Sequence, residues 1–102
     1  MKKQGKGEQI VVSETQRQIL REARERLGLT QATLEKKARV GKTYAWYVET
    51  GTTKTTALVP FLRLVSTLQK EAARGEVPAR LATGLQKLAQ SLEKRRSAPA
   101  KR

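Results

Sequence analysis

The sequence predicts a small all-α domain of five helices. Residues that favour helices, such as Ala, Leu, Gln, Glu, Lys and Arg, are abundant, whereas Phe, Trp and Tyr make up 4% of the chain and there are only seven Gly and three Pro. Apolar residues recur at helical spacing in several segments. A chain of 102 residues is long enough for one modest hydrophobic core. We therefore expect a single domain.

Capping residues delimit the first three helices. The first is predicted to begin at Ser13, because Ser13 and Gln16 fit a capping box, and to end at Gly28. Thr30 suits the N-cap of a short second helix over residues 31–38. After a break at residues 39–41, a third helix is expected over residues 42–50, and Gly51 ends it.

The last two helices are recognised by their apolar stripes. The fourth, residues 57–68, is the most apolar, with Thr56 as its expected N-cap and Pro60 tolerated in its first turn. A linker at residues 71–77 leads to Pro78, which suits the first turn of a fifth helix ending near Glu93.

Both ends of the chain are polar and basic. Residues 1–12 are predicted to form a basic N-terminal arm and residues 94–102 a basic tail, both flexible. Within the arm, the short β-prone patch at residues 10–12 is expected either to pair as a small strand or to pack over the first helix.

Composition and charge narrow the possible functions. The 22 Lys and Arg against 9 Asp and Glu give a net charge of +13, which attracts polyanions such as nucleic acids. The chain has no Cys and no His, so the commonest general base and the usual soft metal ligands are missing, and we expect neither an enzyme nor a cofactor. No apolar run approaches the roughly 18 residues of a membrane span, and the first residues lack the apolar stretch of a signal peptide. We expect a cytoplasmic protein that does not bind membranes.

The segment LREARERLGLTQATLEKKARVGKTYAWYVETG, residues 20–51, carries a recognisable motif. It has Leu-Thr-Gln at residues 29–31, then Leu34, then Val-Glu-x-Gly at residues 48–51. With these spacings it resembles the phage-repressor and Cro-type (Xre) helix-turn-helix family, over about residues 14–69. The other matching residues are Arg24, Leu27, Gly28, Ala38, Val40 and Tyr44. The resemblance implies a repressor-like fold, with residues 13–69 as the DNA-binding domain.

The resemblance also implies which residues meet base edges. In such proteins the third helix lies in the DNA major groove. By position, the predicted base contacts are Lys42, Thr43, Trp46 and Tyr47. Lys42 is able to donate to guanine O6 and N7, Thr43 offers a hydroxyl and a methyl group, and Trp46 is expected at the groove wall or against a thymine methyl.

Other residues are predicted to bind phosphate or to support the motif. The predicted phosphate contacts are Gln31, Arg17, Lys36, Lys37 and Lys54, with Gln31 acting through its side chain and the backbone amides at the start of the second helix. Tyr44 is expected to have a half-buried scaffold role, and Glu49 is expected to pair with Arg24 or to cap the helix end. The predicted core positions around the motif are Leu20, Leu34, Ala45 and Val48.

Two residues depart from the family pattern. Arg39 stands where the family usually has Gly, at a turn position that often needs positive φ and costs a non-glycine residue about 1 kcal/mol. Gly41 is expected to absorb this strain by shifting the turn. Glu35 stands where a small residue is frequent, so a more open packing of the second and third helices is predicted.

The fifth helix is the predicted dimerisation element, within a segment formed by residues 70–93. Leucines spaced four, three and four residues apart form a narrow apolar seam, and the resemblance implies a homodimer. These residues are Leu81, Leu85, Leu88 and Leu92. Packing of the seam on its own domain is the alternative. Gly84 in this helix would permit close approach of another backbone.

The sequence therefore predicts a sequence-specific regulator that binds double-stranded DNA, most simply a dimeric repressor. The alternative is an antitoxin that represses its own operon and binds a toxin protein, because residues 55–68 resemble the fourth-helix region of antitoxins paired with kinase-like toxins. A third hypothesis is nonspecific coating of nucleic acid by charge alone.

Overall fold

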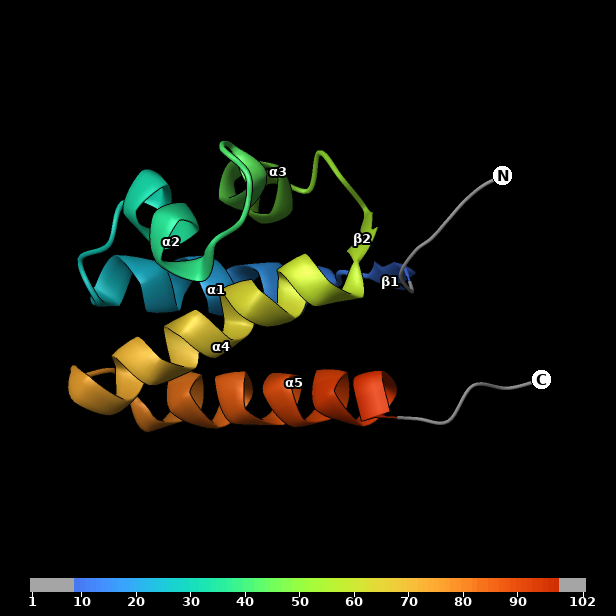
Figure 1. Cartoon of the computed structure of the whole chain (residues 1–102). Coiled ribbons are helices and arrows are strands. Elements are labelled where there is room, and N and C mark those ends of the chain that lie inside the picture. Colours follow the sequence, from blue (N-terminus) through green and yellow to red (C-terminus); the bar gives the residue numbers. More distant parts are fainter. Residues whose placement is uncertain (1–8, 98–102) are drawn as a thin grey trace, which may run out of the picture.

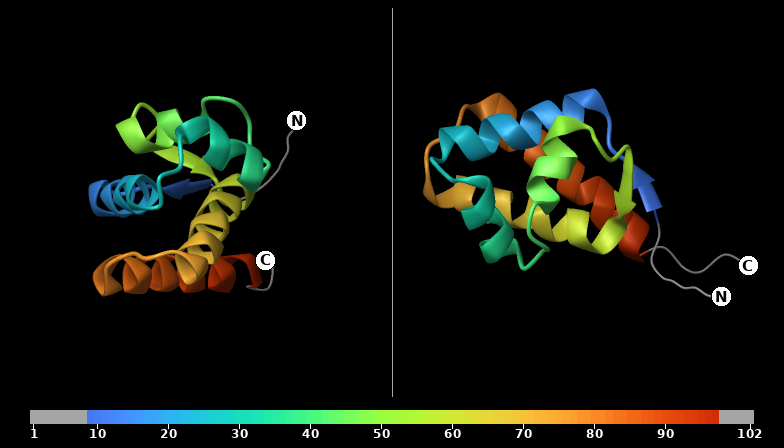
Figure 2. Two further views of the ribbon diagram at one scale, coloured as in Figure 1. Left: turned by 90° about the vertical axis from the view of Figure 1, so that its left-hand side faces the viewer. Right: turned by 90° about the horizontal axis from the view of Figure 1, so that it is seen from above.

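The computed structural model describes residues 9–97, which form three stacked layers of helices (Figure 1). The elements, in chain order, are β1 (Gln9–Val11), α1 (Glu14–Arg26), α2 (Gln31–Ala38), α3 (Tyr44–Thr50), β2 (Thr55–Ala57), α4 (Leu58–Arg74) and α5 (Ala79–Ser97). In Figure 1, α2 and α3 lie at the top, α1 and α4 in the middle and α5 along the bottom, and the left panel of Figure 2 shows the same layers from the side. The prediction of a mostly helical fold is confirmed, with a small two-stranded sheet in addition.

The predicted boundaries of the first two helices are confirmed. Ser13 and Gln16 form the capping box, with Gln16 N–H donating to Ser13 Oγ over 3.1 Å and Ser13 N–H donating to Gln16 Oε1 over 2.9 Å. Gly28 follows α1 with a φ of 71°, in the left-handed region that glycine adopts easily. Thr30 caps α2, its Oγ1 accepting from Thr33 N–H over 3.0 Å.

A two-stranded antiparallel sheet joins two segments that are distant in sequence. Ile10 of β1 is paired with Thr56 of β2, so the patch at residues 10–12 pairs as a strand, which was one of the two expectations. Thr56 is buried in this sheet, and the prediction that it caps α4 is wrong. The N-cap is Ala57, without a side-chain hydrogen bond. A strand forms here because the β-branched residues Thr55 and Thr56 pair with the strand at residues 9–11.

The helices α4 and α5 are longer than predicted and supply most of the core. Helix α4 continues to Arg74, so only a short connection separates it from α5, and α5 continues to Ser97. Residues 94–97 of the predicted tail are therefore helical, and residues 9–11 of the predicted arm are a strand. The rest of both predicted ends, residues 1–8 and 98–102, lies outside the described residues. No helix within residues 9–97 is both long and apolar enough to cross a lipid bilayer.

The predicted dimer seam on α5 is wrong, because its side chains are inside the monomer. Leu81 and Leu85 are completely buried, and Leu88 and Leu92 are 7% and 3% exposed. The α5 helix packs on α4 and α1. Gly84 permits this packing, since a Cβ at that position would lie 3.0 Å from Ile19 Cδ1 of α1. The seam therefore belongs to the chain's own core.

Candidate nucleic-acid interface

The short helix α3 lies at the surface and has one buried and one exposed side. Ala45 and Val48, predicted as core residues, are buried, whereas Trp46 and Tyr47 are 45% and 42% exposed. The two exposed rings contact each other edge to face, with centroids 5.2 Å apart. The right panel of Figure 2 looks directly onto α2, α3 and the loop to β2. The single Trp of the chain thus lies on an outer face of the molecule.

The start of α3 differs from the prediction. The helix begins at Tyr44 rather than at residue 42, because Thr43 has a φ of 65° and cannot continue a right-handed helix. In this conformation the Thr43 hydroxyl donates to the Lys42 carbonyl and makes no capping bond to α3. Lys42 and Thr43 are both exposed, and Lys42 has no ion-pair partner among residues 9–97. Positive φ at a β-branched residue was not anticipated.

The turn between α2 and α3 keeps the strain that was expected to be relieved. Arg39 has a φ of 60°, as the family pattern implied, but Gly41 is not in the left-handed region. The prediction that Gly41 absorbs the strain is wrong. Instead, hydrogen bonds hold the turn: Val40 N–H donates to the Glu35 carbonyl over 3.1 Å, and Arg63 Nη1 donates to the Arg39 carbonyl over 3.3 Å.

Glu35 supplies the capping bond that Thr43 does not. Its side chain is 7% exposed, and its Oε2 accepts from Ala45 N–H over 2.8 Å. A residue of α2 therefore caps the first turn of α3. The sequence suggested that Glu35 would loosen the packing of these helices, but its carboxyl group links them directly.

Arg24 and Glu49 form the predicted pair beneath α3. Arg24 Nε and Nη2 donate to the two carboxylate oxygens of Glu49 over 2.7 and 3.0 Å, and the two side chains are 13% and 4% exposed. Arg24 Nη1 also donates to the Leu29 carbonyl, and Gln31 Nε2 donates to Glu49 Oε1 over 3.0 Å. The bidentate Arg24–Glu49 pair and the Gln31 bond link α1, α2 and α3 to one another.

Tyr44 has the half-buried scaffold position that was expected. Its hydroxyl and Thr56 Oγ1 are 2.7 Å apart, which ties α3 to β2. Burial raises the pKa of Tyr44 above its ordinary value of 10.0, and the hydrogen bond with Thr56 partly opposes this shift. Of the three aromatic residues at 44–47, one therefore supports the fold and two face outward.

Three of the predicted phosphate contacts already have partners within the chain. Arg17 donates to the Val12 carbonyl and pairs with Glu14, both over 2.8 Å, and its guanidinium packs against Gly51. The Gln31 amide is bonded to Glu49, although the backbone N–H groups at residues 31 and 32 have no acceptor in the described part of the chain. Lys37 pairs with Glu71 of α4 over 3.6 Å.

Lys36 and Lys54 are exposed and have no ion-pair partner within residues 9–97. A further cation, Arg21, was missed. It lines a concavity of about 270 Å³ with Gln31 and Trp46, and only its Nε is paired, with Glu25 over 3.3 Å. No sequence signal distinguished Arg21 from the other arginines of α1.

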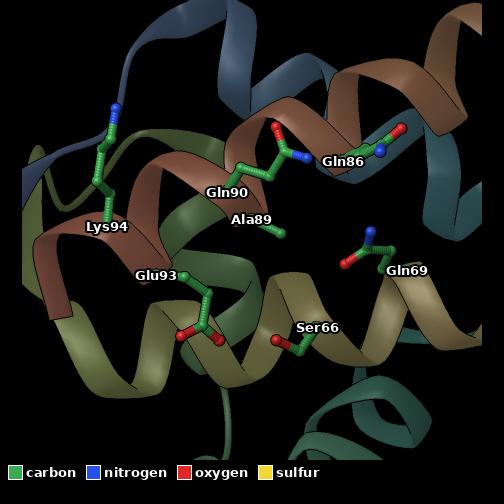
Figure 3. A pocket seen from close by; sticks show the side chains of 7 residues that line it. All are labelled: Ser66, Gln69, Gln86, Ala89, Gln90, Glu93 and Lys94. Atoms are coloured by element: carbon green, nitrogen blue, oxygen red, sulfur yellow. The ribbon is translucent and has the colours of Figure 1, made fainter. Parts of the chain in front are cut away.

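A second open groove runs between α4 and α5, away from α3 (Figure 3). It is lined by Ser66, Gln69, Gln86, Ala89, Gln90, Glu93 and Lys94. Three amides and a hydroxyl dominate this lining, and it lacks the cluster of cations that phosphate binding requires. Within residues 9–97, no group of three or more acidic side chains is arranged to hold a metal ion.

The chain matches no protein-family model, no curated protein and no solved structure in comparisons with each. The functional argument therefore depends on the geometry of the chain itself.

Proposed function

We propose that the protein is a sequence-specific DNA-binding transcriptional regulator of the Xre helix-turn-helix type, in which α3 reads the major groove. The observation that carries the proposal is the two-sided character of α3. Its inner side is held by Ala45 and Val48, and its outer side and preceding turn present Lys42, Thr43, Trp46 and Tyr47 to solvent. A cation and a hydroxyl in the turn before α3, together with two aromatic rings on the helix, suit hydrogen bonding and apolar contact with base edges.

The neighbouring groups suit contact with the DNA backbone. The first two amides of α2 are free within the described residues, and Arg21 and Lys36 lie on α1 and α2. Backbone amides at a helix start and flexible cations are typical phosphate ligands. In this proposal α2 and α1 bind the sugar–phosphate backbone while α3 contacts bases.

We propose a repressor that acts as a homodimer, because one module of this size is too small to be selective in a genome. Since the α5 leucines are buried in the monomer, the dimer must use another face. The alternative function, an antitoxin, would use the same α3 to regulate its operon and a second surface to bind a toxin. Co-purification with a toxin encoded beside it is the test of that alternative.

Selection from a random duplex library, followed by fluorescence anisotropy, tests the proposal. The full chain is titrated against the selected duplex and a scrambled duplex across a salt series. We expect the selected duplex to bind about a thousandfold tighter at physiological salt. Equal binding of both duplexes, with the same steep loss as salt rises, would mean that charge alone drives binding and would overturn the proposal.

A further inference from the structure

Helix α3 is capped in a different way from the two helices before it. Ser13 and Thr30 cap α1 and α2 with their own hydroxyl groups, as is usual at a helix start. At α3 the N-cap residue Thr43 bonds the Lys42 carbonyl instead. The capping oxygen belongs to Glu35 of α2, which accepts from the N–H of Ala45, ten residues later in the chain.

This arrangement has two consequences for the surface of α3. The Thr43 hydroxyl makes no capping bond to α3, and the Thr43 side chain is exposed next to Lys42. The orientation of α3 is tied to α2 through a side chain, because the Glu35 oxygen is 2.8 Å from Ala45 N–H. The same residue also accepts from Val40 N–H through its backbone carbonyl, so it holds both the turn and the helix that follows.

We infer that Glu35 is a positioning residue for base recognition: its side-chain oxygen, bonded to Ala45 N–H, sets the angle at which α3 presents Lys42, Thr43 and Trp46. This inference rests on the proposed DNA-binding function. Base recognition requires donors and acceptors held in register with the base edges, so a small rotation of α3 costs selectivity before it costs the fold. The Glu35 bond adds a polar link to the apolar contacts that Ala45 and Val48 of α3 make with the hydrophobic core.

Three variants separate positioning from a general structural role. Glu35→Gln keeps an acceptor oxygen at the same reach, Glu35→Asp shortens the side chain, and Glu35→Ala removes the acceptor. Each is compared at equal folded fraction by the ratio of its affinities for the selected and scrambled duplexes. We expect the ratio to stay within about threefold in Glu35→Gln and to fall about tenfold or more in Glu35→Ala, with Glu35→Asp between them.

Glu22→Gln and Glu22→Ala are the matched controls, because they make the same changes in charge and size at a carboxylate that pairs with Arg80 of α5, far from the α2–α3 turn. Both should leave the ratio unchanged. An undiminished ratio in folded Glu35→Ala, or an equal loss in Glu35→Gln and Glu35→Ala, would overturn the inference.

The single Trp gives a readout that needs no DNA. Trp46 follows Ala45 directly and is half-exposed, so its emission reports the setting of α3. Glu35→Ala should shift the emission to longer wavelength at unchanged far-UV helical signal, and Glu35→Gln should not. An emission change in Glu35→Ala but not in Glu35→Gln, without any sequence preference in the wild-type chain, would reject the proposed function and leave Glu35 as a residue that only sets the position of α3. Unchanged emission in folded Glu35→Ala would reject the positioning of α3 by Glu35.

Discussion

The lower helices, α4 and α5, and the upper helices, α2 and α3, are stabilised in different ways. Helix α4 buries six apolar side chains, and the leucines of α5 pack against them. Helix α3 buries only Ala45 and Val48. What it lacks in apolar contact is supplied by polar links to Arg24, Glu35 and Thr56.

The difference extends to backbone strain. Both non-glycine residues with positive φ in the described part of the chain, Arg39 and Thr43, lie in the turn between α2 and α3. Strained residues persist only where the surrounding structure holds them, and they concentrate at functional sites. The comparison indicates that apolar packing of α4 and α5 stabilises the fold. The turn between α2 and α3 is strained at Arg39 and Thr43, next to the exposed side chains of α3.

The largest expected effect comes from breaking the polar support of α3. The Glu49 carboxylate is 4% exposed beside Arg24. Arg24→Ala removes its cation, and we expect a loss of about 3 to 5 kcal/mol in the free energy of unfolding. Urea denaturation measures it. The control Arg21→Ala removes an exposed pair and should cost less than about 1 kcal/mol. Similar small losses in both variants would mean that polar links do not support the upper helices.

A cavity in the lower helices should cost nearly as much. Leu85→Ala empties a fully buried site, and we expect a loss of about 2 to 5 kcal/mol by urea denaturation. Trp46→Ala removes a larger but half-exposed side chain and should cost less than about 1 kcal/mol. A larger loss in Trp46→Ala than in Leu85→Ala would contradict the conclusion that the α4–α5 core, and not the exposed side of α3, stabilises the fold.

Relieving the backbone strain in the turn between α2 and α3 should raise the stability of the chain. Arg39→Gly removes the penalty of the left-handed conformation and should raise stability by about 0.5 to 1 kcal/mol, after the entropic cost of glycine. Arg39→Ala is the control, because alanine is strained in the same way. Thr43→Gly should stabilise similarly and also weaken sequence preference. A lower melting temperature in Arg39→Gly than in Arg39→Ala would show that the turn is not strained.

The smallest effect concerns pH. Because the pKa of Tyr44 is raised in the folded chain, the unfolded chain loses the tyrosine proton first, near the ordinary value of 10.0. The protonated phenol of Tyr44 therefore contributes its full stability below about pH 10. This contribution is lost as the pH rises toward the pKa of Tyr44 in the folded chain. Urea midpoints between about pH 9 and pH 11 should fall less steeply in Tyr44→Phe than in the wild type.

Local rules predicted the parts of the fold that depend on neighbouring residues. The capping box at Ser13, the left-handed Gly28 and the buried positions of α3 follow from residues a few places apart in sequence. The leucine pattern of α5 correctly marked buried residues but not their partner, because intrachain packing and a dimer seam produce the same spacing. The strand β2 was missed because its partner lies more than forty residues earlier.

The candidate site was predictable in part of its residues but not in its support. Exposure of Trp46 and Tyr47 follows from helical spacing, whereas Lys42 is exposed in the turn before the helix. The capping role of Glu35 requires knowing where α3 lies relative to α2, and the packing of the Arg17 guanidinium against Gly51 requires knowing how α1 approaches the end of α3. Such contacts are set by tertiary structure, so no local pattern indicates them.

The most direct test of the account compares Lys42→Ala with Lys36→Ala by fluorescence anisotropy on the selected and scrambled duplexes. If α3 reads bases, Lys42→Ala lowers affinity for the selected duplex by about 1 to 3 kcal/mol and changes the scrambled duplex much less. Lys36→Ala should weaken both duplexes alike and reduce the salt slope by about one unit. Equal losses on both duplexes for Lys42→Ala would contradict the assignment of α3 as the helix that reads the major groove.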